Sequence, residues 1–84
     1  MFYVYIIKSK KDGSIYIGYT ADLKRRIKEH NSSTSKSTKN KVPLELVYYE
    51  SYKSMKDAKY RERNLKRFAK AYQQLKKRIS SSLS

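Results

Sequence analysis

The sequence predicts a single α+β domain in which a small three-stranded β-sheet is flanked by helices, with the elements in the order ββαβαα. Runs rich in β-branched and aromatic residues occur at 2–7, 14–19 and 44–49, which is typical of short strands. Apolar residues at helical spacing occur between and after these runs. Because 84 residues can enclose only one small core, we expect one domain over residues 1–79 and a disordered tail at 80–84.

The first two strands are expected to form a β-hairpin, because a short polar segment that ends in Asp12 and Gly13 separates them. If these two residues form the turn, Ser9 lies opposite Tyr16. The alternation of side chains along paired strands then predicts one shared face. That face carries Tyr3, Tyr5, Ile7, Tyr16 and Gly18.

A short helix is expected from Ala21 to His30, with Thr20 as its N-terminal cap. Apolar residues recur within it at the i, i+4 spacing of a buried stripe. Arg26 and His30 flank this stripe on the helical wheel. Periodicity leaves two interpretations of them open: an edge ion pair beside a packed histidine, or a functional site.

The segment 31–43 is rich in Ser, Thr, Asn and Lys and has no apolar periodicity, so we expect a loop. Its length favours a functional role over a simple connection. Lys36, Lys39 and Lys41 lie in this loop and are candidates for binding an anionic partner.

Two more helices are expected after the third strand. Ser54 and Asp57 resemble a capping box, which places a helix start there. We expect a break or bend near residues 68–70. A last basic helix is then outlined by Tyr72, Leu75 and Ile79.

Glu62 stands out on the second of these three helices, because it projects to the middle of a stripe formed by Met55, Ala58, Leu65 and Ala69. An unpaired carboxylate against a core costs on the order of several kcal/mol. It must therefore find a cation, hydrogen bonds or a metal ion. An ion pair, for example with an arginine of the first helix, and a magnesium or manganese site both satisfy this requirement.

The charge of the chain indicates a polyanionic partner. There are 21 Lys and Arg against 7 Asp and Glu, a formal net charge of +14. Nucleic acid is the leading partner, since each neutralised phosphate releases counterions. No run approaches the ~18 apolar residues of a membrane span, so we expect no membrane association.

Other composition features narrow the location and the metal chemistry. The N-terminal segment does not resemble a secretory signal, so we expect a cytoplasmic protein. The chain has no Cys and one His, which excludes disulfides, thiolate sites and His-rich zinc sites. Any bound metal should be a hard cation that prefers oxygen ligands.

Two short motifs in the hairpin resemble a known family. Tyr3-Val4-Tyr5 is followed after ten residues by Tyr16-Ile17-Gly18, which resembles the paired motif that names the GIY-YIG nucleases. The resemblance continues through the run 23–26 and His30 to Glu62, and so spans residue 2 to about residue 68. Tyr3 and Val4 depart from the Gly and Ile of the first motif.

The basic loop refines this resemblance. Lys36, Thr38 and Lys39 precede Pro43 as in the stand-alone bacterial subgroup that includes YhbQ. The chain is also similar to the nuclease domain at the front of the excinuclease subunit UvrC. The stand-alone subgroup commonly lacks the first Gly of the motif, so we interpret Tyr3 as a mark of that subgroup.

The resemblance implies a divalent-metal-dependent endonuclease that hydrolyses phosphodiester bonds, in DNA first of all, with possible structure selectivity and a link to DNA repair or processing. It implies that Glu62 anchors a single Mg²⁺ or Mn²⁺ and that Arg26 neutralises the phosphoryl oxygens. Tyr5 would activate water, Tyr16 would orient water or phosphate, and His30 would share the proton handling. Contacts to nucleic acid are expected from Lys36, Lys39, Lys41, Arg61 and Lys66.

Two other readings of the sequence stay open. A binding module could keep the fold and charge but lack turnover, with tyrosines stacking on bases and lysines contacting phosphates. A ribosome-associated or other structural basic protein is the third. Because no DNA-binding domain is appended, a protein partner could supply substrate specificity.

Overall fold

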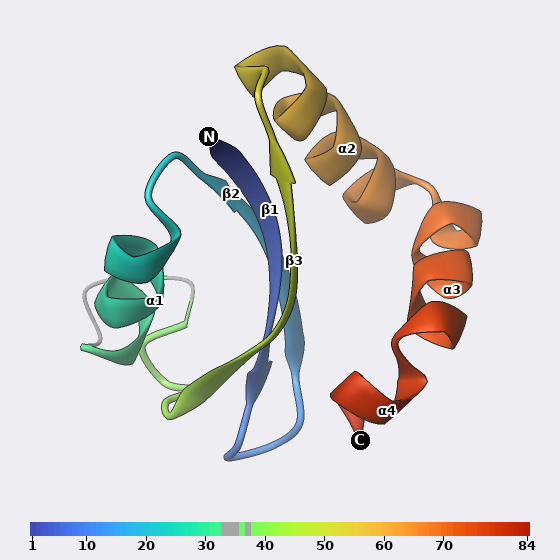
Figure 1. The fold of residues 1–84 in the computed structure, drawn as a ribbon. Coiled ribbons are helices and arrows are strands. Elements are labelled where there is room, and N and C mark those ends of the chain that lie inside the picture. The colour runs from blue at the N-terminus through green and yellow to red at the C-terminus, as the bar shows by residue number, and fades with distance from the viewer. Residues whose placement is uncertain (33–35, 37) are drawn as a thin grey trace.

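The computed structural model of the chain describes residues 1–32, 36 and 38–84. Strands and helices follow the predicted order, with one short helix added at the C-terminus (Figure 1). The elements are β1 (Phe2–Ser9), β2 (Ile15–Thr20), α1 (Leu23–Asn31), β3 (Leu44–Tyr52), α2 (Met55–Arg67), α3 (Ala69–Arg78) and α4 (Ser80–Leu83). The predicted α+β class is confirmed.

The three strands form one antiparallel sheet in the order β2-β1-β3. Helix α1 covers one face of this sheet, and α2, α3 and α4 cover the other (Figure 1). The central strand β1 carries four consecutive buried residues, Val4 to Ile7. A continuous apolar run is expected for a strand that is covered on both faces.

Each face of the sheet has its own apolar cluster. Ile7 packs under α1 and Ile6 packs under α2 and α3, and both are 0% exposed. Burial of a side chain of this size stabilises the fold by roughly 1.5–3 kcal/mol. The cluster under α1 includes Tyr5, Ile7, Leu44, Leu23 and Ile27, and the opposite cluster includes Val4, Ile6, Ala58, Leu65 and Leu75. Packing on both faces therefore fixes the sheet that carries the side chains at its edges.

The hairpin has the predicted shared face but a different register. Ile7 lies opposite Tyr16 and Tyr5 lies opposite Gly18, so the expected pairing of Ser9 with Tyr16 is wrong by two residues. The turn spans four residues, because the Ser9 amide donates to the Ser14 carbonyl at 2.8 Å. Gly13 adopts φ +78°, a left-handed conformation that favours glycine.

Helix α1 begins two residues later than predicted. Asp22 is its N-cap and accepts a hydrogen bond from the Arg25 amide at 3.1 Å. The helix ends at Asn31, whose side-chain amide donates to the Leu44 carbonyl at 2.9 Å and whose side-chain oxygen accepts from the Leu44 amide at 2.7 Å. These two bonds fix the end of α1 to the start of β3.

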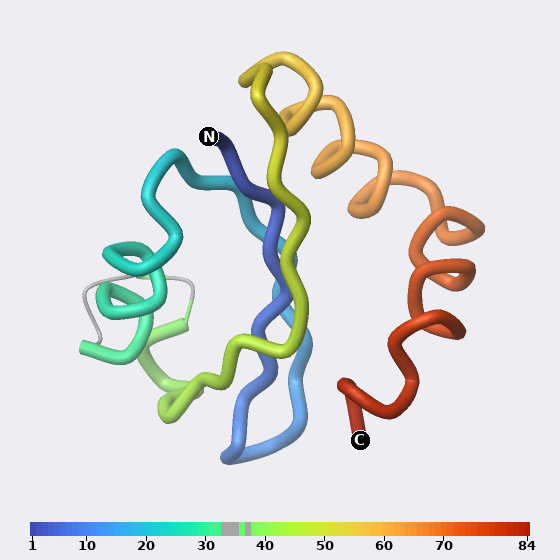
Figure 2. Tube along the Cα trace, viewed as in Figure 1, coloured from blue at the N-terminus to red at the C-terminus, as the bar shows by residue number. Residues whose placement is uncertain are grey.

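The chain reverses after β3 and returns along α2 (Figure 2). The predicted cap is confirmed, since the Ser54 hydroxyl accepts from the Asp57 amide at 3.4 Å. The predicted break is also confirmed: Phe68, with φ −111° and ψ 106°, ends α2 and begins α3. None of the described helices is long and apolar enough to cross a membrane.

The C-terminal tail differs from the sequence prediction. Residues 80–84 were expected to be disordered, but Ser80–Leu83 form α4. Leu83 packs on the cluster under α2 and α3, and its carbonyl accepts a hydrogen bond from Lys8 Nζ. A single apolar residue in a serine-rich tail gives no periodicity, which is why this contact was not predicted.

Candidate active site

A cavity of about 380 Å³ lies beside the edge strand β2. Side chains from both strands of the hairpin, from α1, from the following loop and from α2 line it. Most of these residues carry a polar group suited to acid–base or phosphate chemistry. The lining residues are Tyr5, Tyr16, Ile17, Gly18, Tyr19, Arg26, His30, Thr38, Glu62 and Lys66. The four predicted catalytic residues and the predicted metal ligand are thus brought together.

Gly18 determines where the Tyr5 ring can lie. The two residues are directly opposite in the hairpin, and the Tyr5 side chain crosses the glycine. A Cβ atom at position 18 would lie 2.3 Å from Tyr5 Oη and 2.4 Å from Cζ. Any side chain there would displace the ring. A glycine inside a strand often marks such a close approach, and this signal identifies Gly18 as a residue of the site.

A buried hydrogen-bond chain joins Tyr5, His30 and Thr38. Tyr5 Oη lies 2.9 Å from His30 Nε2, and His30 Nδ1 lies 2.7 Å from Thr38 Oγ1. The three residues are 3%, 4% and 1% exposed. Burial and the nearby charge of Arg26 lower the pKa of His30, so its imidazole is neutral at neutral pH. One ring nitrogen therefore donates and the other accepts.

Thr38 was not among the predicted site residues. It lies in the loop between α1 and β3, where the sequence has no periodicity that could place a side chain. Its position next to His30 comes from the tertiary fold. Because the buried Thr38 hydroxyl is the hydrogen-bond partner of His30 Nδ1, His30 Nε2 is the ring nitrogen that bonds to the Tyr5 hydroxyl.

Arg26 lies beside Tyr5 at the wall of the cavity. Its Nη1 atom is 3.1 Å from Glu29 Oε1, and its guanidinium also interacts with the Tyr5 hydroxyl. Burial raises the pKa of Tyr5 above its ordinary value, although Arg26 acts in the opposite direction. Tyr5 is therefore a protonated phenol at neutral pH.

Glu62 faces the cavity rather than the core. Its side chain is 23% exposed, and its Oε2 atom lies 2.9 Å from Lys66 Nζ. The predicted apolar stripe is only half correct, since Ala58 and Leu65 are buried but Met55 is 47% exposed. Water reaches the carboxylate, so the large desolvation cost expected from the sequence does not apply.

The position of Glu62 follows from helix geometry. Ala58 and Leu65 form the buried ridge of α2. At about 100° per residue, Arg61 and Glu62 lie roughly 50° to either side of that ridge. Arg61 therefore faces one edge of the sheet and Glu62 faces the other.

The described residues of the cavity offer one carboxylate to a cation. Within residues 1–32, 36 and 38–84, no three His, Asp or Glu side chains converge as a metal cluster. Glu62 is the carboxylate among the residues that line the cavity. Mg²⁺ often takes one or two carboxylates and completes its shell with water and phosphate oxygens. This donor set suits such an ion and does not suit zinc.

Some of the residues predicted to contact nucleic acid are open to solvent, and others are paired within the fold. Lys66 lines the cavity. Lys36 and Lys39 are exposed and lie close in the sequence to Thr38, which also lines it. Lys41 is paired with Asp12, whose pKa its ammonium lowers. Arg61 is engaged within the fold, as described next.

Arg61 holds α2 on β3. Its Nε and Nη2 atoms lie 3.0 and 3.1 Å from the two Glu50 oxygens, and the Tyr48 and Tyr52 hydroxyls donate to the same carboxylate. Burial and these bonds raise the pKa of both tyrosines to about 12. The Arg61 guanidinium is therefore a structural partner of Glu50, and its contact with phosphate stays a prediction.

Comparison with known proteins gives the family. The model of the GIY-YIG catalytic domain matches residues 1–80. A UPF0213 protein from Staphylococcus saprophyticus is 42% identical over 69 residues, which cover 81% of this chain and 83% of that protein. One from the archaeon Haloquadratum walsbyi is 37% identical over 73 residues, with 86% and 81% covered.

A solved structure agrees with this result. The solution NMR structure of a UPF0213 protein from Bacillus halodurans matches with a TM-score of 0.56 and 37% identity, and covers 94% of this chain and 87% of that one. The chain belongs to the GIY-YIG family, and its relatives fit the predicted stand-alone subgroup. GIY-YIG domains are nuclease domains, which supports phosphodiester hydrolysis on nucleic acid as the general class of activity.

Proposed function

We propose that this protein is a divalent-metal-dependent endonuclease that hydrolyses phosphodiester bonds in DNA. The observation that carries the proposal is the convergence of Tyr5, Tyr16, Arg26, His30 and Glu62 on one cavity. These residues lie up to 57 positions apart in the chain. Periodicity pairs Tyr5 with Tyr16 and Arg26 with His30, but it gives no reason for the two pairs and Glu62 to meet. Phosphate binding alone does not require the buried tyrosine–histidine–threonine chain or a carboxylate at the cavity.

Charge stabilisation is the first task of the site. A phosphodiester in the cavity would lie between Arg26 on α1 and Lys66 on α2. Two cations from opposite sides can neutralise the non-bridging oxygens as charge develops. The net charge of +14 favours the approach of a polyanion.

Glu62 would hold the divalent ion, Mg²⁺ or Mn²⁺. When bound, such an ion supplies Lewis-acid stabilisation of the phosphoryl and leaving oxygens. The Glu62–Lys66 pair is a single contact near solvent, so the carboxylate can exchange its ammonium partner. Lys66 is then available for phosphate.

Proton transfer is the task of Tyr5 and His30. With Nδ1–H donating to Thr38, His30 Nε2 accepts from the Tyr5 hydroxyl. Tyr5 can take a proton from the attacking water while it gives its own proton to Nε2. This relay does not require Tyr5 to be ionised at rest, which agrees with its raised pKa. Tyr16 would orient the water or phosphate.

A catalytically silent binding module of the same fold is the second candidate. The observation that favours it is the Glu62–Lys66 contact, since a carboxylate that keeps this partner would not take a metal ion. Under either function we propose a cytoplasmic location and, for the nuclease, a role in DNA repair or processing, with a protein partner that supplies substrate choice.

One panel of substrates tests the proposal. The purified protein is incubated with labelled single-stranded, duplex, flap and junction DNA, and with matched RNA, in magnesium, manganese or EDTA. We expect cleavage of DNA that EDTA abolishes. Binding without cleavage of any substrate would favour the silent module, and cleavage of RNA alone would overturn the choice of DNA.

A further inference from the structure

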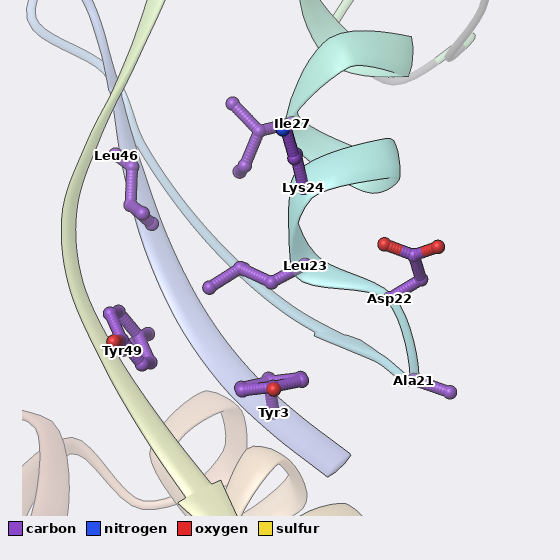
Figure 3. A pocket seen from close by; sticks show the side chains of 8 residues that line it. All are labelled: Tyr3, Ala21, Asp22, Leu23, Lys24, Ile27, Leu46 and Tyr49. Carbon is purple, nitrogen blue, oxygen red and sulfur yellow. The ribbon is translucent and has the colours of Figure 1, made fainter. Parts of the chain in front are cut away.

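A second and larger cavity lies on the α1 side of the sheet. Its volume is about 600 Å³, within the range of roughly 300–1,000 Å³ typical of small-ligand pockets. Figure 3 shows Leu23 and Ile27 of α1 facing Leu46 and Tyr49 of β3, with Tyr3 of β1 below them. We call this cavity the tyrosine groove.

Two tyrosines give the groove an aromatic wall. The rings of Tyr3 and Tyr49 meet edge to face, with centroids 5.9 Å apart and an interplanar angle of 65°. Tyr49 nevertheless remains 51% exposed. An aromatic ring that is half in contact and half in solvent can stack on a planar ligand.

The tyrosine groove is distinct from the active-site cavity, which lies at the β2 edge and takes side chains from both faces of the sheet. Among the residues that the structure describes, the two cavities share none of their lining. Tyr3 lines the groove and Tyr5 lines the active site, and they are two residues apart on β1. This spacing corresponds to about 7 Å along the strand. One ligand strand could therefore occupy both cavities.

Basic residues border the groove on α1. Lys24 lines the groove and also lies, with Arg25 and Lys28, on the outer surface of the helix. Exposed cations beside an aromatic slot are the arrangement by which proteins bind single-stranded nucleic acid, with stacked bases and neutralised phosphates. A second copy of this chain is a poor occupant, because each copy carries a net charge of +14.

We propose that the tyrosine groove binds an unpaired nucleobase of the nucleic acid whose backbone enters the active-site cavity. The base stacks on Tyr49 against Tyr3, and Lys24 contacts the adjoining phosphate. The inference rests on the proposed function for its ligand class, but it does not depend on turnover. It makes substrates with unpaired nucleotides the preferred ones.

The test measures affinity in a Glu62→Gln background, so that cleavage does not interfere. The probes are a fluorescent oligothymidylate and a blunt-ended duplex. Tyr49→Thr replaces the ring with a β-branched residue that also favours strands. Tyr49→Phe keeps the ring, and Tyr60→Ala is the control. Tyr60 is 62% exposed on α2 and lies outside the groove.

We expect Tyr49→Thr to weaken oligothymidylate binding about fivefold or more, the loss of one base stack. Duplex binding should change less than about twofold, and Tyr49→Phe and Tyr60→Ala should bind like the parent. Thermal melting establishes that each variant is folded. Lys24→Gln should reduce the slope of log affinity against log salt for oligothymidylate by about 0.7, the value of one phosphate contact on a single strand.

Three results would overturn the inference. The first is unchanged oligothymidylate binding by folded Tyr49→Thr, and the second is an equal loss of affinity for both probes. The third is a dimer of the parent protein in sedimentation, without nucleic acid, that Tyr49→Thr converts to a monomer, since it would place a dimer contact at this groove. Failure of the nuclease proposal gives a different result. If wild type cleaves no substrate, but Tyr49→Thr still lowers affinity for oligothymidylate more than for duplex, catalysis is overturned and the groove is supported.

Discussion

Arg61 and Glu62 are neighbours on α2, and each belongs to a carboxylate–cation pair. The two pairs differ in how many hydrogen bonds the carboxylate accepts. Glu50 is 16% exposed and receives both guanidinium contacts of Arg61 together with two tyrosine hydroxyls. Glu62 has a single contact with Lys66, whose side chain is 53% exposed. A carboxylate with saturated bonds stabilises one arrangement, whereas a sparsely bonded one near solvent can change partners.

The structural pair also serves the candidate site. Arg61 fixes one side of the α2 ridge to β3, and Glu62 is the next residue on the other side. The Glu50–Arg61 contact and the buried ridge together hold α2 in the orientation in which Glu62 faces the cavity. The contrast between the two pairs makes specific predictions for stability and activity.

The largest effect is expected on cleavage, from a change in the shape of the active-site cavity rather than in its charge. In Gly18→Ala the new methyl group would overlap Tyr5 Oη, so the ring must leave its position and its bond to His30 is lost. We expect cleavage to fall by about 100-fold or more. Single-turnover kinetics measures the chemical step, and the melting temperature establishes that the fold is retained. Cleavage within about twofold of wild type would show that Tyr5 placement is unimportant.

The next effect is on the structural side. Glu50→Gln removes the charge that holds Arg61 and should lower the free energy of unfolding by about 2 kcal/mol, since the pair is only partly buried. Chemical denaturation measures the change. Glu45→Gln is the matched control, because Glu45 contacts Lys10 at 3.8 Å and is 53% exposed; it should be nearly neutral.

The pH dependence of this difference has a defined sign. Burial alone would raise the pKa of Glu50, but the bonds from Arg61, Tyr48 and Tyr52 outweigh it and hold the pKa below its ordinary value. The stabilisation is complete above the unfolded-state pKa of ~4.3 and is lost as the pH falls through the folded-state pKa. The gap between wild type and Glu50→Gln should therefore shrink in acid. A gap independent of pH would contradict an ionised Glu50.

The sequence predicted much of this arrangement. The strands, the Ser54 cap and the break at Phe68 follow from local chemistry, and they are confirmed. The sequence singles out Glu62, because a carboxylate in an apolar stripe is anomalous. The stripe has two borders, however, and only tertiary packing shows that Glu62 lies on the solvent side.

Other features lie beyond local reasoning. Arg61 and Lys66 are both basic residues on one helix, and only the position of β3 distinguishes the structural one. The turn register depends on the Asp12 side chain, which accepts from the Ser14 amide at 2.9 Å. Thr38 reaches His30 through a loop whose path no periodicity describes.

The smallest effect is expected for the exposed pair. Lys66→Gln should change the free energy of unfolding by only about 0.3–0.5 kcal/mol, the value of an exposed i, i+4 pair. It should also weaken nucleic-acid binding, because a phosphate contact is lost. A loss of stability as large as that of Glu50→Gln would remove the distinction between the two pairs.

The central claim is that Glu62 is available to a metal ion, and Glu62→Gln tests it with two readouts. Wild type should melt at a higher temperature when manganese is added, since ligation stabilises the folded state. The variant should lose this response and its cleavage, keep its nucleic-acid binding, and lose less than about 1 kcal/mol of stability without metal. Glu45→Gln should behave like wild type in every respect. Unchanged cleavage and an unchanged manganese response in Glu62→Gln would contradict the assignment.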